Sequence, residues 1–161
     1  RMEFANHDVY EGEWKNGLMD GEGLYRFYDP KKDEYTSSYE GQFAQGKRHG
    51  TGRMMFPNHT FYVGQWQADK RVGTGFATFA NGDSFQGLWK DDHMMRGVYA
   101  LANGDRYDGE ISNGKFNGYG KYFFTSGQWF EGEWKDGQML KGMVYFPDGK
   151  LKEIAEGSII E

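Results

Sequence analysis

Acidic side chains recur along the chain with a regular spacing that could indicate acid or base catalysis. They are Glu11, Glu13, Glu40, Asp108, Glu110, Glu131 and Glu133. A general acid or base must lie within hydrogen-bond reach of a reacting group. These carboxylates instead alternate with aromatic residues in short stretches, which is typical of the solvated face of a strand. We therefore predict no catalytic residue and no enzyme activity.

Two glycine-rich stretches, Gly41–Lys47 and Gly109–Lys115, share the Gly-x-x-x-x-Gly-Lys spacing of a phosphate-binding loop. Such a loop needs a Ser or Thr after the lysine to reach Mg²⁺, but Arg48 and Phe116 occupy that position. The same glycine spacing also arises from a repeat in the sequence. We therefore predict no bound nucleotide and no cofactor.

A metal site is not expected either. The four histidines are His7, His49, His59 and His93, and none has a paired ligand spacing. The chain contains no cysteine, which removes thiolate ligands and disulfides and fits a reducing compartment. The sequence therefore favours a cytoplasmic protein without a metal.

A basic cluster is the best candidate for contacts with an anionic partner. It consists of Lys47, Arg48, Lys70 and Arg71, which stacked neighbouring repeats would bring together. These side chains could contact an anionic lipid or an acidic peptide. The alternative is a solvated edge whose charges discourage strand addition. The net charge of −5 favours this alternative.

The composition is that of an ordered chain. No stretch of the 161 residues approaches the ~20 apolar residues of a membrane span, no leader is visible, and nothing points to nucleic acid. Glycine supplies 25 residues, and aromatic residues make up 18% of the chain. Because disordered glycine-rich chains lack aromatic residues, the glycines are predicted to have a geometric role in a packed fold.

A tandem repeat organises the chain. Phe130–Gly137 is a near copy of Tyr10–Gly17, and aligning the sequence with itself places six aromatic residues in one column. These residues are Tyr10, Tyr39, Tyr62, Phe85, Tyr107 and Phe130. We predict a repeat array over residues 1–149, with a partial repeat at 1–9 and repeats that start at 10, 39, 62, 85, 107 and 130.

Each repeat is predicted to form two short strands joined by a turn. The first strand carries the column aromatic, a Gly two residues later and a large residue two positions after that. These three residues have the same parity and so face the same side, as in a half-buried strand. The large residues are Trp14, Phe43, Trp66, Trp89, Ile111 and Trp134. Asn-Gly or similar pairs follow at the turn. The second strand opens with Gly-x-Gly or a single Gly and continues with apolar residues of one parity.

Three segments depart from the repeat. Residues 29–38 are polar and charged and are predicted to form a protruding loop. Residues 150–161 form a tail in which Leu151, Ile154 and Ala155 have helical spacing and Gly157 could end a short turn. We expect this tail to cover the last hairpin. Residues 1–9 match the second half of a repeat, so we expect a fragment of a longer array.

The spacing Tyr-x-Gly-x-Trp-x-x-Gly-x-x-x-Gly-x-Gly, complete in residues 10–23, resembles the MORN (membrane occupation and recognition nexus) repeat. The resemblance covers about residues 10–149. It implies an all-β fold, a single-layer, elongated and twisted antiparallel sheet of about six stacked hairpins with a groove for protein partners. It also implies a non-enzymatic scaffold of cilia, cell cortex or cytoskeleton, or an array attached to a larger multidomain protein. Some family members form homodimers, and lipid binding has been proposed for several.

The aromatic columns are predicted both to form the core and to line this groove, because a single-layer sheet leaves one aromatic face accessible. The predicted groove residues are Tyr10, Trp14, Tyr39, Phe43, Tyr62, Trp66, Phe85, Trp89, Tyr107, Phe130 and Trp134. We expect a protein-binding scaffold that holds a helical or extended partner segment, as a monomer or a homodimer. The rival hypothesis is a phospholipid-binding module that recruits the chain to membranes.

Overall fold

The computed structural model describes residues 1–155, and these residues form strands and turns without a helix. The strands are β1 (Met2–Glu3), β2 (Val9–Lys15), β3 (Leu18–Asp29), β4 (Glu34–Ala44), β5 (Lys47–Met55), β6 (Phe61–Gln67), β7 (Lys70–Thr78), β8 (Ser84–Lys90), β9 (His93–Ala100), β10 (Arg106–Ser112), β11 (Lys115–Phe123), β12 (Trp129–Lys135), β13 (Gln138–Tyr145) and β14 (Leu151–Ile154).

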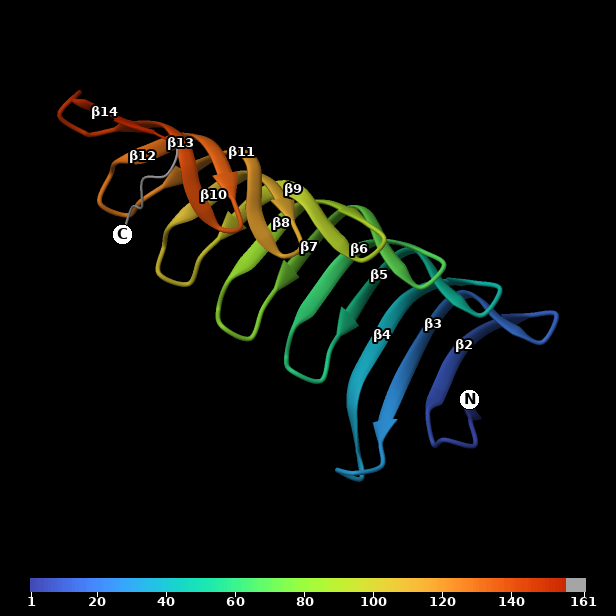
Figure 1. Cartoon of the computed structure of the whole chain (residues 1–161). Coiled ribbons are helices and arrows are strands. Elements are labelled where there is room, and N and C mark those ends of the chain that lie inside the picture. Colours follow the sequence, from blue (N-terminus) through green and yellow to red (C-terminus); the bar gives the residue numbers. More distant parts are fainter. Residues whose placement is uncertain (156–161) are drawn as a thin grey trace. The chain divides into compact units, whose positions relative to one another are not determined.

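The strands belong to one antiparallel sheet whose order is the order of the chain (Figure 1). The predicted all-β fold and the predicted antiparallel hairpins are confirmed. The chain divides into two compact units. Unit 1 comprises residues 1–80 with 90–92, and unit 2 comprises residues 81–89 and 93 to the C-terminal end.

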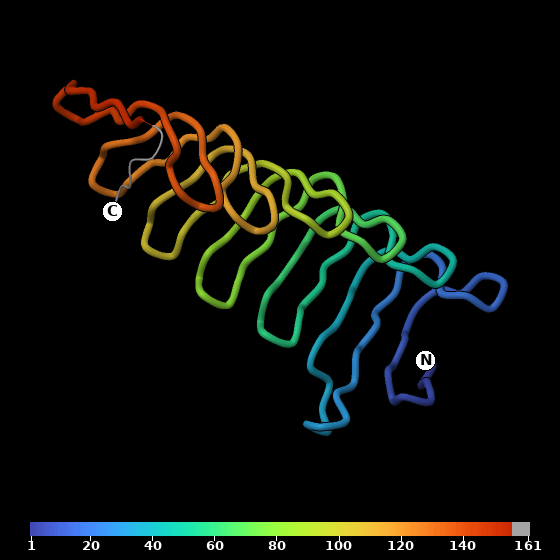
Figure 2. The backbone as a smooth tube through the Cα atoms, in the orientation of Figure 1, coloured from blue at the N-terminus to red at the C-terminus, as the bar shows by residue number. Residues whose placement is uncertain are grey.

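Two kinds of turn alternate along the tube in Figure 2. The tight turns have two residues with positive φ, as in Asn16-Gly17 (52° and 77°) and Ala68-Asp69 (48° and 71°). This is the type I′ geometry that matches the twist of a two-residue hairpin. The other turns have three residues, of which the last has positive φ, as His59 does at 67°. His7, at 73°, holds the same position in the first such turn, and Gly82, Gly104, Gly127 and Gly149 hold it in four others, so the two histidine backbones are strained there.

The core of each repeat is a buried aromatic ring packed over two glycines of paired strands. Tyr10, Tyr39, Tyr62, Phe85, Tyr107 and Phe130 are all 0% exposed. A Cβ built on Gly23 would lie 2.4 Å from the Tyr10 ring, and one built on Gly52 would lie 2.1 Å from the Tyr39 hydroxyl oxygen. Only glycine leaves room for the ring, which is the geometric role that the sequence predicted.

A bulge accompanies the buried tyrosine in the four full-length repeats that carry one. The strand register shifts just after the glycine that follows Tyr10, Tyr39, Tyr62 and Tyr107. The tyrosine hydroxyl donates to the carbonyl of the residue three positions later, at 2.6–2.8 Å. The side chain of that residue accepts a backbone N–H from the next strand; the four residues are Glu13, Gln42, Gln65 and Glu110. Glu13 and Glu110 therefore stabilise the bulge as well as facing solvent.

Two predictions for irregular segments are wrong. The predicted loop over residues 29–38 is confined to a turn at 30–33, because β3 and β4 continue to pair up to Asp29 and Glu34. Leu151–Ile154 does not form a helix but forms β14, which pairs with β13. Part of the tail therefore adds a strand to the last hairpin. Gly157, the predicted end of the helical turn, lies outside the described residues.

Candidate partner-binding face

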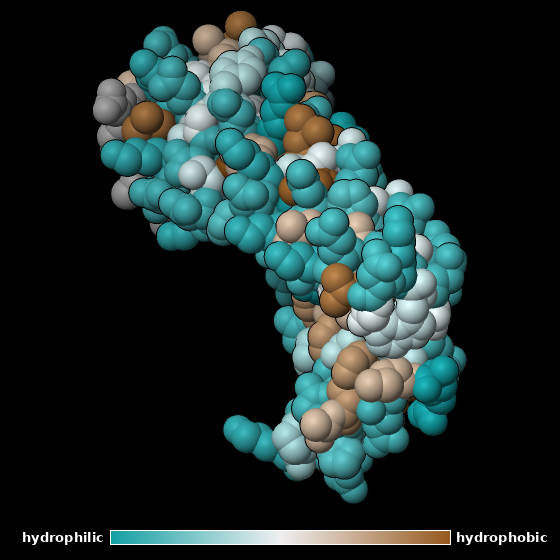
Figure 3. Space-filling model, turned by 90° about the vertical axis from the view of Figure 1, so that its right-hand side faces the viewer, coloured by the Kyte–Doolittle hydropathy of each residue, from teal (hydrophilic) through white to brown (hydrophobic). Residues whose placement is uncertain are grey.

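The aromatic face is the side of the sheet that carries the buried column aromatics and the apolar residues of the second strands. In unit 1 the second-strand rows are Tyr25/Phe27, Met54/Phe56 and Ala77/Phe79, and in unit 2 they are Tyr99/Leu101, Tyr122/Phe124 and Val144/Phe146. The last member of every row is half-buried. Apolar residues bordered by hydrophilic ones are visible on the surface in Figure 3. These rows are the aromatic surface that a partner can reach.

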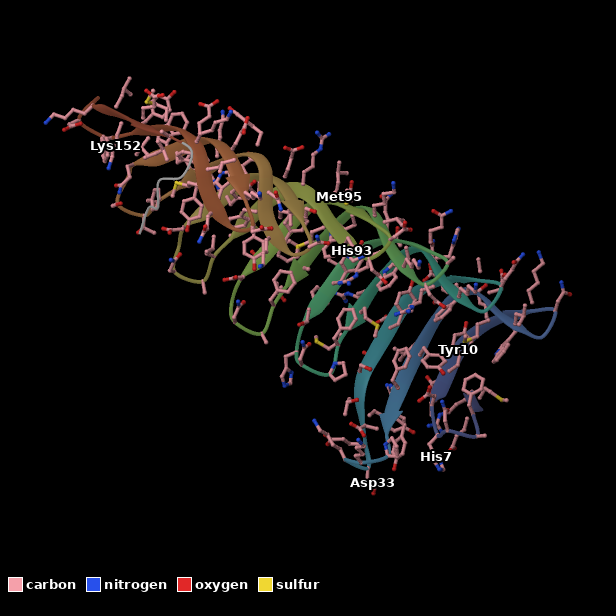
Figure 4. The ribbon with its side chains drawn as sticks, in the orientation of Figure 1. His7, Tyr10, Asp33, His93, Met95 and Lys152 are labelled. Atoms are coloured by element: carbon pink, nitrogen blue, oxygen red, sulfur yellow. The ribbon has the colours of Figure 1, made fainter. Side chains whose placement is uncertain are left out.

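The predicted groove residues lie beneath that surface. Ten of the eleven are buried, at 0–5% exposure, and only Trp14 is exposed, at 43%. Tyr10, labelled in Figure 4, is fully buried in the body of unit 1. The physical reason is that each column ring covers the paired glycines and is itself covered by neighbouring rings, as in the Tyr10–Phe43 contact at 5.2 Å. In this structure the ten residues are the packed floor of the face, and the second strands supply its accessible part.

Three buried or half-buried aspartates fix second-strand tyrosines. Asp8 accepts a hydrogen bond from the Tyr25 hydroxyl at 2.6 Å and another from the Tyr28 backbone N–H at 2.8 Å. Asp83 with Tyr99, and Asp105 with Tyr122, repeat this arrangement, also at 2.6 Å. Burial and the hydrogen bond to the aspartate raise the pKa of each tyrosine. The rings therefore stay neutral and fixed in orientation.

The sequence reasoning missed these pairs, although the chain contains a signal for them. Each aspartate ends an Asn-x-Asp loop, and the tyrosine follows 16 or 17 residues later. Where the loop ends in Thr60, the corresponding second-strand residue is Ala77, and where it ends in Gln128, that residue is Val144. Aspartate and tyrosine thus occur together or not at all in these repeats, as expected of partners in one hydrogen bond.

Two members of the predicted basic cluster are neutralised by neighbours. The Arg48 Nε donates to Asp69 Oδ1 at 3.0 Å, and the guanidinium lies 4.7 Å from the centroid of the Trp66 ring. Arg71 makes the equivalent ion pair with Asp92 at 3.1 Å. Lys47 and Lys70, the other two members, are exposed. The arginines therefore connect one repeat to the turn of the next.

One hollow opens on the aromatic face of each unit. The unit 1 hollow has a volume of about 190 Å³ and is lined by Met19, Tyr25, Phe27, Tyr39, Phe43, Gly46, Arg48 and Asp69. The unit 2 hollow has a volume of about 240 Å³ and is lined by Asp83, Met94, Tyr99, Leu101, Ile111, Gly114, Lys115, Phe116 and Gly137. Most of these residues occupy matching repeat positions, as Met19 and Met94 do. The two hollows are therefore equivalent features of the repeat.

A single repeat position accounts for the two hollows. In the first strand, the second large residue is Trp in four repeats, Phe43 in the second and Ile111 in the fifth. Phe43 lines the unit 1 hollow and Ile111 lines the unit 2 hollow. Both side chains are smaller than an indole, and the missing volume is open to the surface. Where Trp is present, as at Trp66, the indole packs against Tyr39 and Tyr62 and donates to the Gly52 carbonyl at 3.1 Å.

Residues 1–155 include no helix that is long and apolar enough to span a membrane. Within the same residues there is no group of three or more histidine or acidic side chains arranged to hold a metal ion.

The sequence profile of the MORN repeat matches residues 10–29, 39–61, 62–84, 85–106, 107–129 and 130–140. The chain belongs to the MORN-repeat family. The repeat starts predicted from the aromatic column coincide with the starts of these six matches. The family assignment accounts for the regular glycines and aromatics but does not by itself name a partner.

Among the proteins that this chain is similar to are one curated relative and two solved structures. MORN repeat-containing protein 3 of Xenopus laevis is 41% identical over 44 residues, which span 27% of this chain and 18% of the frog protein. The TCP domain of Drosophila melanogaster SAS-4, solved with a proline-rich motif of Ana2, has 10% identity and a TM-score of 0.56, and the alignment covers 95% of this chain and 81% of that one. For the TCP10 domain of Danio rerio CPAP the identity is 13%, the coverage 96% and 82%, and the TM-score 0.36. The SAS-4 likeness concerns the fold alone.

Proposed function

We propose that this chain is a non-enzymatic, protein-binding scaffold module that holds an extended or helical partner segment along its aromatic face. The observation that carries the proposal is the set of half-buried second-strand rows with a hollow in each unit. Among residues 1–155 no helix or second sheet covers this face. Exposed aromatic surface bordered by polar residues is typical of a protein interface.

Two further observations support a protein partner. Fixed tyrosines provide large contact areas with little loss of side-chain freedom on binding, and Asp8, Asp83 and Asp105 hold three of them in place. The fold is also shared with the SAS-4 TCP domain, which was solved in complex with a peptide motif. We propose a cytoplasmic location in a cytoskeletal, ciliary or cortical assembly.

The experiment compares proteins captured from a cell lysate by the wild-type chain and by variants of matched design. Phe56→Glu alters the aromatic face of unit 1, and Phe124→Glu alters that of unit 2. Glu40→Arg changes the charge at an exposed position of the opposite face. Circular dichroism first establishes that each variant is folded. The proposal expects direct partners to be lost with a phenylalanine variant and retained with Glu40→Arg, and it fails if the captured set is the same for all three.

Membrane recruitment is the rival hypothesis, and no contact in the structure favours it. Two of the four cations on which it rests, Arg48 and Arg71, are already ion-paired. Flotation with anionic vesicles separates the hypotheses. Strong flotation that is abolished when Lys47 and Lys70 are changed to Gln would replace the protein-binding proposal with the lipid one.

Self-association also stays a prediction. Light scattering coupled to size exclusion over a concentration series measures it directly, and we expect a monomer or a closed dimer. A ladder of species larger than the dimer would contradict this prediction.

A further inference from the structure

We infer that the two hollows are anchor sites for a proline-containing partner segment in the polyproline II conformation. The segment carries a proline at every third residue and, at the unit 2 hollow, an acidic residue beside the anchor. This inference rests on the proposed function, because it specifies the partner of the same aromatic face.

The hollows are suited to a small apolar ring. The unit 1 hollow lies between the Tyr25/Phe27 row and Phe43, and the unit 2 hollow lies between the Tyr99/Leu101 row and Ile111. Aromatic rings and thioether or aliphatic side chains make up most of each lining, together with glycines and one acidic and one basic residue. The Tyr25 and Tyr99 hydroxyl groups donate to Asp8 and Asp83, so their hydrogen atoms are already used within the chain. Proline segments in the polyproline II form dock in aromatic-lined grooves of this kind.

The repeat spacing selects the polyproline II conformation among extended forms. Equivalent strands of neighbouring repeats are separated by two strand spacings, which span about 9.5 Å. A polyproline II helix advances about 9.3 Å in one turn of three residues. A segment that crosses the strands therefore presents the same side to each successive row. With one proline in the hollow, the next faces Phe56 in unit 1 or Phe124 in unit 2.

The rim of the unit 2 hollow adds a charge requirement. Lys115 lines that hollow and is exposed, and its amino group forms no ion pair with any described residue. Asp83 at the same rim already accepts the Tyr99 hydroxyl and the Ala102 backbone N–H. Because Lys115 forms no ion pair with a described residue, it favours a carboxylate in the partner. The unit 1 rim carries the paired Arg48 and Asp69 and makes no such demand.

The test uses three fluorescein-labelled peptides of ten residues. The first has prolines at every third position and an aspartate next to the central proline. The second has the same composition with its prolines two and four residues apart. The third is the first with lysine in place of aspartate. Binding to the full chain is measured by fluorescence anisotropy, and the same measurement is made on variants. The Ile111→Trp variant fills the unit 2 hollow with the residue that four other repeats have at this position.

We expect the first peptide to bind more tightly than the second and the third. Loss of an anchor contact at an interface typically costs tenfold or more, so Ile111→Trp should weaken binding of the first peptide at the unit 2 hollow roughly tenfold. Phe43→Trp is the matched change for the unit 1 hollow. Gln86→Trp, an added indole at an exposed position of the opposite face, is the control and should leave binding unchanged. Lys115→Glu should reverse the preference between the first and third peptides.

Three results would overturn the inference. They are equal binding of the first two peptides, binding unaffected by both hollow-filling variants, and no binding of any peptide. If a hollow-filling variant is unfolded by circular dichroism, the Lys115→Glu reversal still decides the question for unit 2. Loss of lysate partners with Phe124→Glu alongside any of these results would show that the face binds protein in another form. The proposed function fails on a separate result, namely that neither Phe56→Glu nor Phe124→Glu removes any protein captured from the lysate.

Discussion

Replacing Trp66 by alanine should destabilise unit 1 more than any exposed change of the same size. Trp66 is 3% exposed and contacts Tyr39 and Tyr62 edge-on, with ring centroids 5.4 and 5.2 Å away. The Arg48 guanidinium lies over its ring at 4.7 Å, and its indole N–H donates to the Gly52 carbonyl at 3.1 Å. Alanine removes all four contacts and leaves a cavity.

The expected loss of unfolding free energy follows from these contacts. A buried tryptophan covers ~150–250 Å², which corresponds to ~4–6 kcal/mol at ~25 cal/mol per Å² as an upper estimate. The lost hydrogen bond adds ~1 kcal/mol, while partial collapse of the cavity reduces the cost. Measured tryptophan-to-alanine changes in cores cost ~3–5 kcal/mol. We expect a value in that range for Trp66→Ala.

Trp14→Ala is the matched control, because it changes the same residue type in the same column. Trp14 is 43% exposed, and its ring contact is with Tyr10 at 5.1 Å. Roughly half of the burial is already absent, so we expect a loss of about 2 kcal/mol. Since repeat arrays need not unfold in one step, urea denaturation is combined with hydrogen exchange of the β4–β7 amides. Equal losses for the two variants would refute the reasoning that burial sets the cost.

Three other predictions follow from individual contacts. A double-mutant cycle of Asp105→Asn and Tyr122→Phe, measured by urea denaturation, should give a coupling of ~1.5–3 kcal/mol, since the 2.6 Å bond has a charged acceptor; a coupling near zero would contradict it. His59→Gly should stabilise the chain by ~1 kcal/mol and raise its melting temperature, because it removes a non-glycine residue at φ 67°; a lower temperature would show that the histidine side chain contributes more than the strain costs. Burial raises the pKa of Tyr62 to about 12, so the folded state keeps a proton that the unfolded phenol loses near pH ~10; stability should fall between those values, and the phenolate absorbance of Tyr62, taken as the difference from a Tyr62→Phe variant, should appear together with unfolding rather than before it.

The strand pattern could be predicted from the sequence because the same aromatic residue and glycines must pack together in each repeat. A column aromatic with a glycine on each of two paired strands has one arrangement in which the ring fits, and every repeat uses it. The segments predicted incorrectly are those without that constraint. Leu151, Ile154 and Ala155 have helical spacing, but β13 offers an unpaired edge, and backbone pairing decides the outcome. The polar residues at 29–38 suggested a loop, although only 30–33 form a turn and the residues on either side of it belong to paired strands.

The accessible part of the face was harder to predict than its core. Periodicity places Tyr39 and Phe56 on the same side of the sheet, but it does not say that neighbouring rings cover the first and leave the second half-buried. That difference depends on how rings from adjacent repeats overlap in three dimensions. The Asp–Tyr pairs were missed for another reason. Their partners lie 16 or 17 residues apart, in different columns of the repeat, and become visible only when both columns are compared.

Departures from the repeat carry the information about binding that the repeat itself cannot carry. A side chain present in every repeat can serve only the packing that every repeat shares. Phe43 and Ile111 break the tryptophan column, and a hollow opens at each of them. The fold tolerates the change because the ring beneath, Tyr39 or Tyr107, stays fully buried. One substitution at this position therefore moves an anchor site by a whole repeat without altering the sheet. It follows that the repeat that carries such a departure sets where on its unit a partner segment is anchored.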